Sequence, residues 1–529
     1  MKYVIFLFII FPLTFSYNFL VFCPLFGHSH TTFFAKIADT LSDAGHNVTF
    51  FTPTVTRKYK KINYVRATKK VIHLEPSEQL ALIGDKFQMS DPSKFWKQDS
   101  SIYEILPMIE TFFEMFVELT KVLEENLELL DKLKEENFDV MIFENIVPPA
   151  YSVLDYLQIE TFIPSTSIAF DNSLLYSIGE PFMPSAIPFP ISEYSDRMSF
   201  SERLINSISI PIMNTFLPKR EFKSFRPPYS FIEMASMEPL SSFIFTNSNP
   251  YIDYPRPTLE KNVQIGGISV QIEKLRNMKV DEEWDRILNM RSKTVLISFG
   301  SFMLSKDMPL EYKKALARAM ATFPEVTFIW KYESDDSTTF SKGIENIHFS
   351  KWIPQTALLG DSRLSAFFTH GGLGSVNEVS YLGKPTILCP IFADQMRNAK
   401  MLTRHNGSIE ISKYELADSE KIEEVFRIIL FDTSYRLASE TLALQLANQP
   451  VKPKELLVRH AEFAAQFGRL PSLDPYSRQM SFIEYFLIDL AFVGLISLLL
   501  SSLVLFLITK RTFSFIRFIF FSAVKLKID

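Results

Sequence analysis

The side chains best suited to chemistry follow two short apolar runs in the second half of the chain. The first run, residues 364–369 (LSAFFT), leads directly into His370, Gly371, Gly372, Leu373, Gly374 and Ser375, and then into a helix-like stretch. This order predicts a strand, a glycine turn and a helix N-terminus. Glycines let backbone N–H groups approach a ligand closely, and the positive end of the helix dipole favours a bound diphosphate. The segment therefore predicts a phosphate-binding turn, with His370 and Ser375 as further donors.

A carboxylate and an amide follow the second apolar run, residues 386–392 (TILCPIF). They belong to Asp394 and Gln395, and their chemistry suits the paired hydroxyl groups of a sugar. Two alternatives are open, because many α/β proteins contain a glycine turn without a ligand, and an acid about twenty residues after a Gly-x-Gly also belongs to the dinucleotide-binding pattern. The dinucleotide pattern is disfavoured, since Asn377 replaces its third glycine and the segment lies deep in the chain.

The segment from Trp352 to Gln395 resembles the signature of the UDP-glycosyltransferases, the membrane family that includes the UDP-glucuronosyltransferases. The resemblance rests on Trp352, Gln355, His370, Gly371, Gly372, Glu378, Gly383, Pro385, Pro390, Asp394 and Gln395. A strand-like segment at 295–301 (VLISFGS) is similar to the family strand whose loop, here Gly300 and Ser301, faces the phosphates. The resemblance covers essentially the whole chain.

The resemblance implies a role for each matching residue. The expected contacts with a UDP-sugar are Trp352 and Gln355 at the uracil, Glu378 at the ribose, His370 and Ser375 at the diphosphate, and Asp394 and Gln395 at the sugar. Gly374 departs from the family pattern, because many relatives carry Asn there. One phosphate contact is therefore expected to be missing or replaced by backbone.

The N-terminal half also follows a strand, helix, strand order. An apolar run at 19–25 (FLVFCPL) precedes a helical pattern that ends at Gly45, and a second run follows at 47–53 (NVTFFTP). This order predicts a parallel sheet with ligand loops at the carboxyl ends of its strands. Together with the resemblance, it implies an α/β fold of two facing Rossmann-like domains of the GT-B type, plus a C-terminal transmembrane helix.

Proline and glycine interruptions between 250 and 292 place the boundary between the two halves. The expected parts are an acceptor-binding domain at 17–268, a UDP-sugar-binding domain at 285–447, and a helical segment at 448–486 that packs back on the N-terminal domain.

Sugar transfer to an alcohol needs a base for the acceptor hydroxyl, and histidine titrates in the appropriate range. The resemblance implies this role for His30, in the loop that follows the first predicted strand; His28, two residues earlier, is the alternative. Glu144, at the end of a strand-like run at 138–146, stands where the family usually has Asp. Its longer side chain can still accept a hydrogen bond from one imidazole nitrogen and orient the other.

The implied activity is inverting transfer of glucuronate or glucose from a UDP-sugar to a hydroxyl of a small lipophilic acceptor. No cofactor is expected beyond UDP-glucuronate or UDP-glucose as co-substrate, and no metal, since the sequence contains neither Asp-x-Asp nor His-Glu-x-x-His. A catalytically silent membrane protein that binds UDP-sugar or a lipophile is the alternative, and a homo-oligomer is left open. The net charge of −5 without a basic stripe excludes nucleic acid as a partner.

The two ends of the chain predict a membrane protein. Residues 1–16 have the pattern of a secretory signal peptide, and residues 490–508 form an uncharged run long enough to span a bilayer. The tail at 509–529 is basic, which predicts a cytosolic tail and a luminal body, as in a single-pass type I protein. Lys525 and Lys527 resemble a dilysine retrieval signal, so the endoplasmic reticulum membrane is the expected location.

Two cysteines and two glycosylation sequons complete the prediction. Cys23 and Cys389 lie in apolar runs of different halves and are predicted to be buried thiols. Asn406 is favoured over Asn47 as the glycosylated residue, because Asn47 opens a predicted strand.

Overall fold

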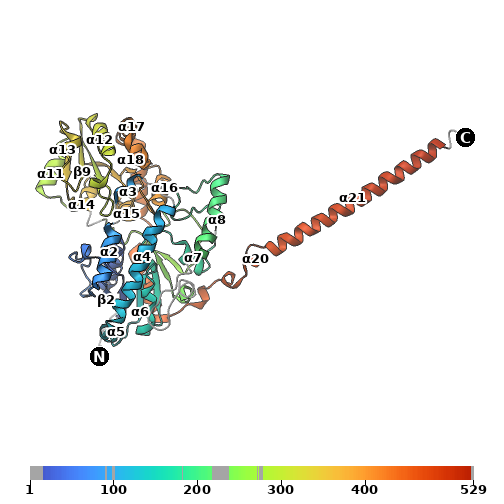
Figure 1. Cartoon of the computed structure of the whole chain (residues 1–529), viewed down its shortest axis with the longest axis horizontal. Coiled ribbons are helices and arrows are strands. Elements are labelled where there is room, and N and C mark those ends of the chain that lie inside the picture. The colour runs from blue at the N-terminus through green and yellow to red at the C-terminus, as the bar shows by residue number, and fades with distance from the viewer. Residues whose placement is uncertain are drawn as a thin grey trace, which may run out of the picture. The chain divides into compact units, whose positions relative to one another are not determined.

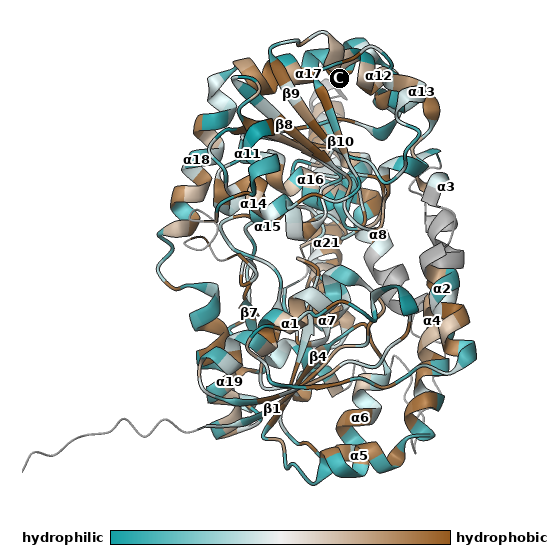
Figure 2. Ribbon diagram, turned by 90° about the vertical axis from the view of Figure 1, so that its left-hand side faces the viewer, coloured by the Kyte–Doolittle hydropathy of each residue, from teal (hydrophilic) through white to brown (hydrophobic). Residues whose placement is uncertain are grey.

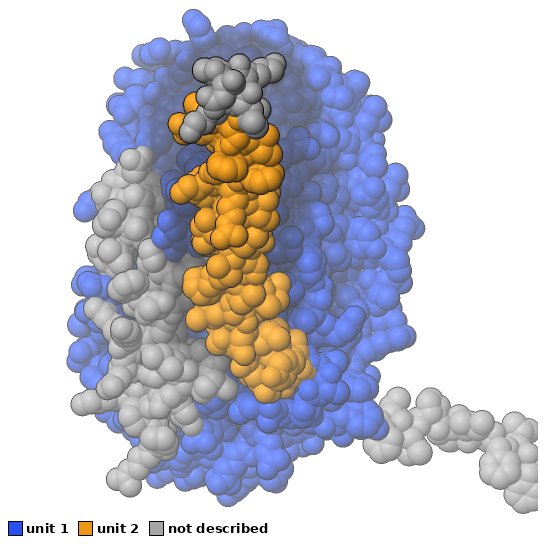
Figure 3. All heavy atoms as spheres, turned by 90° about the vertical axis from the view of Figure 1, so that its right-hand side faces the viewer, with its two compact units in different colours: residues 1–473 blue, residues 474–529 orange. Residues whose placement is uncertain are grey.

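The computed structural model describes residues 16–89, 92–97, 102–181, 183–216, 237–270, 272 and 278–525. The chain forms two compact units, residues 1–473 and residues 474–529 (Figure 3). The predicted signal peptide at 1–16 falls, except for Ser16, outside the described residues.

The N-terminal half of the larger unit contains a seven-stranded parallel sheet in the order β3-β2-β1-β4-β5-β6-β7 (Figure 1). Its strands are β1 (Asn18–Phe22), β2 (Asn47–Phe51), β3 (Lys70–Ile72), β4 (Val140–Glu144), β5 (Phe162–Thr166), β6 (Ile244–Thr246) and β7 (Asn262–Gln264). Its helices are α1 (His28–Asp43), α2 (Glu78–Met89), α3 (Pro92–Lys97), α4 (Ile102–Glu124), α5 (Leu127–Lys134), α6 (Pro149–Leu157), α7 (Asn172–Ser177) and α8 (Phe200–Phe216).

Strand β1 shows why this sheet is buried on both faces. Leu20 and Phe22 join the apolar cluster that contains buried residues of α4, whereas Phe19 and Val21 join the cluster that contains buried residues of α1. Successive side chains of a strand point to opposite faces, so a continuous apolar run predicts a strand covered on both sides. The described helices supply that cover.

The C-terminal half contains a second parallel sheet of six strands, in the order β10-β9-β8-β11-β12-β13. Its strands are β8 (Lys293–Ser298), β9 (Val326–Lys331), β10 (Ile347–Ser350), β11 (Leu364–Thr369), β12 (Thr386–Leu388) and β13 (Ser408–Glu410). Its helices are α11 (Glu282–Leu288), α12 (Leu310–Ala321), α13 (Thr338–Ser341), α14 (Gln355–Gly360), α15 (Leu373–Leu382), α16 (Gln395–Thr403), α17 (Ser419–Phe431) and α18 (Thr433–Ala447). In Figure 2 the hydrophobic residues of β8 and β9 lie among these helices.

Both sheets are doubly wound, with the strand order reversing beside β1 in one and beside β8 in the other. Ligands of such sheets bind at the carboxyl ends of the strands, next to this reversal. The predicted α/β class, with parallel sheets and helices on both faces, is confirmed.

Helix α19 (Pro453–Phe467) returns from the C-terminal half to the first sheet. Leu457, Ala461 and Ala464 belong to the same buried cluster as Phe19 and Val21 of β1. His46 Nε2 lies within hydrogen-bond distance, 3.1 Å, of Oε1 of Glu462. The helix therefore ties the end of the larger unit to the N-terminal sheet.

The smaller unit contains α20 (Phe482–Tyr485) and α21 (Ile488–Lys525). It begins at Asp474, inside the segment expected at 448–486. One described helix is long and apolar enough to cross a membrane, over residues Ile488–Ser522. This helix continues past the predicted run at 490–508, because Lys510, Arg511 and Arg517 remove hydrophobicity but are good helix formers.

We expect Leu457→Ala to destabilise the larger unit, because Leu457 is fully buried between α19 and the first sheet. The free energy of unfolding should fall by about 2–5 kcal/mol. Leu444→Ala on α18 is the control, since Leu444 is 60% exposed and should change it by less than about 0.5 kcal/mol. Urea titration of the solubilised full-length protein measures both; equal effects would contradict the packing of α19.

Candidate active site

The residues singled out by the sequence lie at the carboxyl edges of the two sheets. Glu144 ends β4, and His30 lies in the first turn of α1, after the neighbouring strand β1. In the second sheet, Gly300 follows β8, His370 follows β11 and Asp394 follows β12, which are three neighbouring strands. Parallel pairing therefore brings each set together at one edge.

His30 and Glu144 are in direct contact. The imidazole Nδ1 of His30 lies 2.8 Å from Oε2 of Glu144, and the side chain of His30 is 22% exposed while that of Glu144 is fully buried. A buried carboxylate accepts a hydrogen bond from Nδ1–H, which leaves the lone pair on Nε2. This tautomer is the one that a general base requires.

Ser167, just after β5, is a third member of this group that the sequence did not indicate. Its Oγ lies 2.6 Å from His30 Nδ1, and its backbone N–H donates to Glu144 Oε1 at 3.4 Å. Because 137 residues separate Ser167 from His30, only the pairing of β5 beside β4 brings the two together. The prediction that His30 lies in a loop was wrong: α1 begins at His28, and Gly27 is its N-cap.

His28 has different surroundings from His30. Its Nδ1 lies 3.1 Å from the hydroxyl of Tyr64. Burial, followed by the charges of Lys58 and Lys331, lowers the pKa of His28 below its ordinary value. No contact of His28 with a carboxylate occurs among the described residues, so the two histidines are not equivalent as bases.

The glycine turn at the start of α15 has the predicted form. Gly371 has φ +81°, and Gly372 is the N-cap of the ten-residue helix, without a side-chain cap. The first N–H groups of α15 are therefore available to an anion. A Cβ on Gly300 or Gly372 would lie 2.7 Å from the ring of His370, so both glycines are required for the two loops to close around this ring.

His370 is electrically neutral at physiological pH. Burial, together with the charge of Lys331, lowers its pKa to about 4. The ring can therefore donate one hydrogen bond to a phosphate without carrying a positive charge of its own. Lys331 at the end of β9, which the sequence did not single out, supplies that charge nearby; its Nζ donates to the carbonyl of Gly300 at 2.5 Å.

Glu378 on α15 lies in a network of polar side chains. Its Oε2 accepts from Nε2 of Gln355 at 2.8 Å, and the same Nε2 donates to Oγ of Ser375 at 3.1 Å. Thr356, which the sequence analysis missed, donates to Oε1 of Glu378 at 2.6 Å. Burial raises the pKa of Glu378, and the hydrogen bonds from Thr356 and Gln355 counter this effect.

Asp394 and Gln395 open α16. Asn398 Nδ2 donates to Oδ2 of Asp394 at 2.8 Å and to the carbonyl of Gly371 at 3.2 Å, and so links the carboxylate to the glycine turn. Oε1 of Gln395 accepts from the backbone N–H groups of residues 391 and 392, which leaves its amide nitrogen for a ligand. Burial raises the pKa of Asp394, whereas the hydrogen bond from Asn398 and the charge of His30 lower it.

The remaining residues that were predicted to bind the UDP-sugar are accessible to solvent. Trp352 is 74% exposed, and Lys331 Nζ lies 6.0 Å from the centre of its ring. Ser301 and Gly374 are exposed, and the space in which a Gly374 side chain would lie is open. The structure thus places no group in the position of the Asn that many relatives carry.

The predicted cysteines and sequons are also located. Cys23 and Cys389 are buried, free thiols, as predicted. Asn406 lies in an exposed turn, but Asn47 is exposed too, because its side chain precedes the buried part of β2. Within the described ranges, no group of three or more His, Cys, Asp and Glu side chains is arranged to hold a metal ion.

The site therefore combines a histidine–carboxylate pair at the edge of one sheet with a glycine turn and a set of polar side chains at the edge of the other. Residues 20–527 match the family model described as "UDP-glucoronosyl and UDP-glucosyl transferase". The chain belongs to this family. It is a UDP-glycosyltransferase, an enzyme that transfers sugar from a UDP-sugar.

Several relatives match over most of the chain. A Caenorhabditis elegans protein, ugt-48, is 27% identical over 498 residues, which cover 90% of this chain and 91% of the relative. UDP-glucuronosyltransferase 1-2 of Rattus norvegicus is 25% identical, covering 87% of this chain and 85% of the relative. UDP-glucuronosyltransferase 1A1 of Homo sapiens is 28% identical over 377 residues, 69% of this chain and 67% of the relative.

Solved glycosyltransferase structures share the fold. A UDP-glucosyltransferase from Polygonum tinctorium, crystallised in complex with 3,4-dichloroaniline, has a TM-score of 0.55 and 15% identity, covering 85% of this chain and 98% of that one. The glycosyltransferase of kitacinnamycin has a TM-score of 0.56 and 13% identity, covering 87% and 100%. The UDP-glycosyltransferase therefore has the GT-B fold that its sequence predicted.

The lowered pKa of His370 predicts a pH-dependent stability. In the unfolded chain this imidazole takes up its proton near pH 6.5, but in the folded protein only near pH 4. The contribution of the neutral ring to the free energy of unfolding is therefore complete above pH 6.5 and decreases as the pH falls toward 4. We expect the melting temperature of the UDP-glycosyltransferase to fall less steeply between pH 6.5 and pH 4.5 in His370→Gln than in the unchanged protein; equal slopes would contradict a buried neutral ring.

Proposed function

We propose that this enzyme transfers glucuronate or glucose from its UDP conjugate to a hydroxyl of a small lipophilic acceptor, with inversion and without a metal. The observation that carries the proposal is the contact of His30 Nδ1 with the buried carboxylate of Glu144. A catalytically silent protein would not need this arrangement. The catalytic proposal is therefore preferred to the silent alternative.

The reaction proceeds in one displacement. Nε2 of His30 removes the proton of the acceptor hydroxyl, and the oxygen forms a bond to the anomeric carbon while the bond from that carbon to the UDP oxygen breaks. Glu144 stabilises the imidazolium that results. The electron pair leaves with UDP, whose charge the N-terminus of α15 and the donors around Gly371 stabilise.

Binding of UDP without a metal is supported by groups of the chain itself. The free N–H groups of α15, the neutral donor His370 and the cation Lys331 surround the turn between Gly300 and Gly372. We infer that these groups bind the diphosphate without a metal and without a cofactor other than the UDP-sugar. Glucuronate and glucose both stand as proposed donor sugars.

A lipophilic acceptor is supported by aromatic rings beside the base. The ring of Phe26 lies 4.7 Å from that of His30, and Phe112 lies 5.5 Å from Phe26. Phe87, 5.6 Å from Phe112, is partly exposed and extends this row. Phe26 itself is buried, so Phe87 and Phe112, which are partly exposed, are the rings that a flat apolar acceptor would contact near His30.

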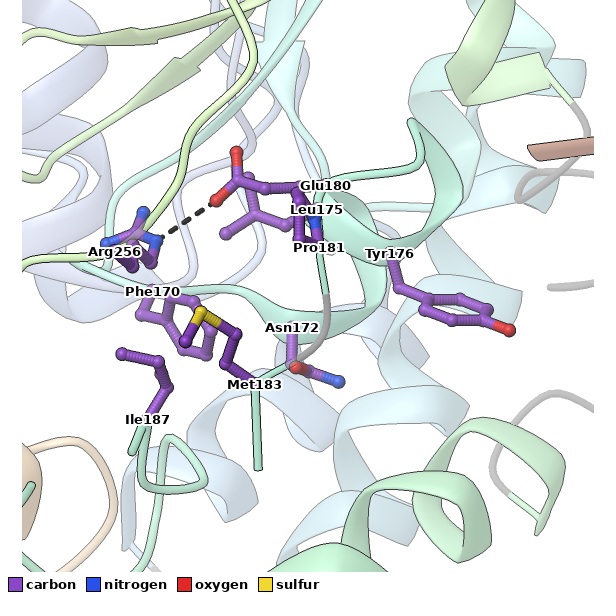
Figure 4. Close-up of a pocket in the computed structure, with 9 residues that line it drawn as sticks. All are labelled: Phe170, Asn172, Leu175, Tyr176, Glu180, Pro181, Met183, Ile187 and Arg256. Carbon is purple, nitrogen blue, oxygen red and sulfur yellow. Dashed lines mark hydrogen bonds and ion pairs between the residues drawn. The ribbon is translucent and has the colours of Figure 1, made fainter. Parts of the chain in front are cut away.

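A pocket on the same half is lined by Phe170, Leu175, Met183 and Ile187, among others (Figure 4). Met183 and Ile187 belong to the segment at 182–191 (FMPSAIPFPI), of which Phe182 falls outside the described residues. The pocket has a volume of about 20 Å³, enough for one water molecule and too little for an aromatic ring. It is therefore not the acceptor site in this conformation.

Replacement of His30, the proposed base, should lower turnover without weakening the binding of UDP. We expect His30→Ala to lower turnover by about two to four orders of magnitude, because it removes the general base, while UDP affinity stays near that of the unchanged enzyme. Glu144→Gln should give a milder defect, since it keeps the shape but loses the charge. Turnover with both UDP-sugars and a phenol panel, together with calorimetric UDP binding, tests these expectations.

His28→Ala is the matched control, because it removes a neighbouring histidine that lacks the carboxylate contact. Near-normal turnover in His30→Ala, or a defect of equal size in His28→Ala, would sink the assignment of the base.

We propose that the enzyme lies in the endoplasmic reticulum membrane as a single-pass type I protein with a luminal catalytic body. A removed signal peptide at 1–16, the apolar helix α21 and the basic residues 509–529 support this orientation. Lys525 and Lys527 would act as the retrieval signal, and Asn406 or Asn47 as the glycosylated residue. The ends of the tail, residues 526–529, fall outside the described residues.

Protease added outside sealed microsomes should trim only the basic tail. Because α21 stays helical to Lys525, cleavage is expected at or beyond the end of its apolar part, and the luminal body should remain intact. Immunoblotting with antibodies against each end measures this. Digestion of the body in sealed vesicles would overturn the orientation.

A further inference from the structure

Three guanidinium groups pack against two aromatic rings where the two halves of the enzyme meet. The guanidinium carbons of Arg256 and Arg397 each lie 4.9 Å from the centre of the Phe170 ring, and those of Arg397 and Arg404 each lie 5.0 Å from the centre of the Tyr254 ring. We call this set of five residues the arginine–aromatic stack.

The stack joins helix α16 to the N-terminal half. Arg397 lies within α16, and Arg404 is its C-cap. Phe170 lies between β5 and α7, and Tyr254 and Arg256 lie between β6 and β7. Two arginines of the C-terminal half therefore pack against rings of the half that holds His30.

The carboxylate of Asp253 forms ion pairs with two arginines of the stack. Its Oδ1 accepts from Nη2 of Arg397 at 2.6 Å, and its Oδ2 accepts from Nη1 of Arg256 at 2.9 Å. Although burial opposes ionisation, the two guanidinium groups hold the pKa of Asp253 below its ordinary value. Glu180 pairs with Nε of Arg256 at 3.0 Å, the contact drawn in Figure 4, so two buried cations face two buried anions.

The guanidinium groups are held by ring faces as well as by oxygens. Nε of Arg397 and Nη2 of Arg256 are buried without a hydrogen-bond partner. Planar guanidinium groups stack on aromatic rings, a geometry that the ammonium group of lysine does not reproduce. The position of α16 therefore depends on the shape of Arg397 and not on its charge alone.

Helix α16 carries the sugar-facing carboxylate. Asp394 is its N-cap, one turn before Arg397, and Asn398, next to Arg397, binds both Asp394 and the carbonyl of Gly371. A shift of α16 against the N-terminal half would move Asp394 relative to His30. It would leave the network of Gln355 and Glu378, which lies within the C-terminal half, in place.

We propose that Arg397 and Phe170 are positioning residues that hold the donor-side Asp394 in register with the acceptor-side His30. Neither residue touches a substrate in this assignment. The inference rests on the proposed function, in which the base and the sugar-binding carboxylate act from different halves. Misplacement of reacting groups by about 1 Å can cost about 100-fold in rate, so a stack of this kind is sufficient to control turnover.

Two variants test the stack while keeping the charges of the buried network. Phe170→Leu removes the ring against which Arg256 and Arg397 pack, and Arg397→Lys keeps the cation but removes the planar group. We expect each to lower kcat by about 10- to 100-fold, with UDP affinity by calorimetry within about threefold of the unchanged enzyme. The midpoint of the pH–rate profile should not move, because His30 and Glu144 are intact.

Arg363→Lys is the matched control. Arg363 also pairs with two carboxylates, those of Asp361 and Asp285, but all three residues lie within the C-terminal half. This variant should leave kcat and UDP affinity unchanged.

A readout that does not require activity accompanies the kinetics. Amide hydrogen exchange of the full-length protein should become faster in α16 and in residues 249–256 of Phe170→Leu and Arg397→Lys, and not in Arg363→Lys. If Arg397→Lys fails to fold, Phe170→Leu decides by the same measurements.

Turnover within twofold of the unchanged enzyme in Phe170→Leu would overturn the inference. A parallel loss of turnover and UDP affinity would overturn it as well, because the stack would then support the donor half itself. Absence of transfer by the unchanged enzyme, with altered exchange in the two stack variants, would contradict the proposed function and leave the coupling of the halves supported.

Discussion

The buried carboxylate of Glu144 imposes the constraint on which the acceptor side of the site depends. It ends a central strand of the first sheet with no solvent exposure, and an ionised carboxylate in such a place needs hydrogen-bond donors. His30, which follows β1, and Ser167, which follows β5, supply such donors from the two sides of β4. The contact fixes the tautomer of His30, and it places the free nitrogen of the ring where a substrate can reach it.

On the donor side, the predicted phosphate-binding turn combines a neutral ring with free backbone donors. His370 is neutral at physiological pH, and burial raises the pKa of both Glu378 and Asp394. Positive charge comes from the N-terminal end of α15 and from Lys331, which also pairs with Glu333 at 3.3 Å. In the proposed function, these dipoles and this cation stabilise the anionic diphosphate.

The division of the site between two sheets makes the contact between the halves part of the chemistry. Helix α19 ties the end of the larger unit to the first sheet through apolar packing, whereas α16 is held through stacked guanidinium groups and buried ion pairs. Apolar packing is not directional, but a guanidinium group that is both stacked and paired has one geometry. The directional contact lies next to the catalytic groups, and the non-directional one lies away from them.

The sequence by itself determined the class of fold, the glycine turn and the family. Apolar runs, helical periodicity and glycine positions are local properties, and they predicted the strands, the start of α15 and the buried cysteines correctly. Ambiguous local signals account for the two differences. The first turn of α1 contains two histidines and has no side-chain cap, so its sequence has the pattern of a loop. The apolar helix at the C-terminus extends through basic residues, which are good helix formers.

Only the tertiary structure decided which side chains act together. Ser167, Thr356, Asn398 and Lys331 reach the site through strand order or from a neighbouring element, at positions that carry no local signal of their role. For the two histidines the resemblance favoured His30, and the structure supplies the physical difference: His28 lies beside Tyr64, whereas His30 contacts a carboxylate 114 residues away. The packing of three arginines against Phe170 and Tyr254 also arises from segments far apart in the chain. Such partnerships depend on which strands the sheet places side by side, and periodicity along one segment contains no information about that order.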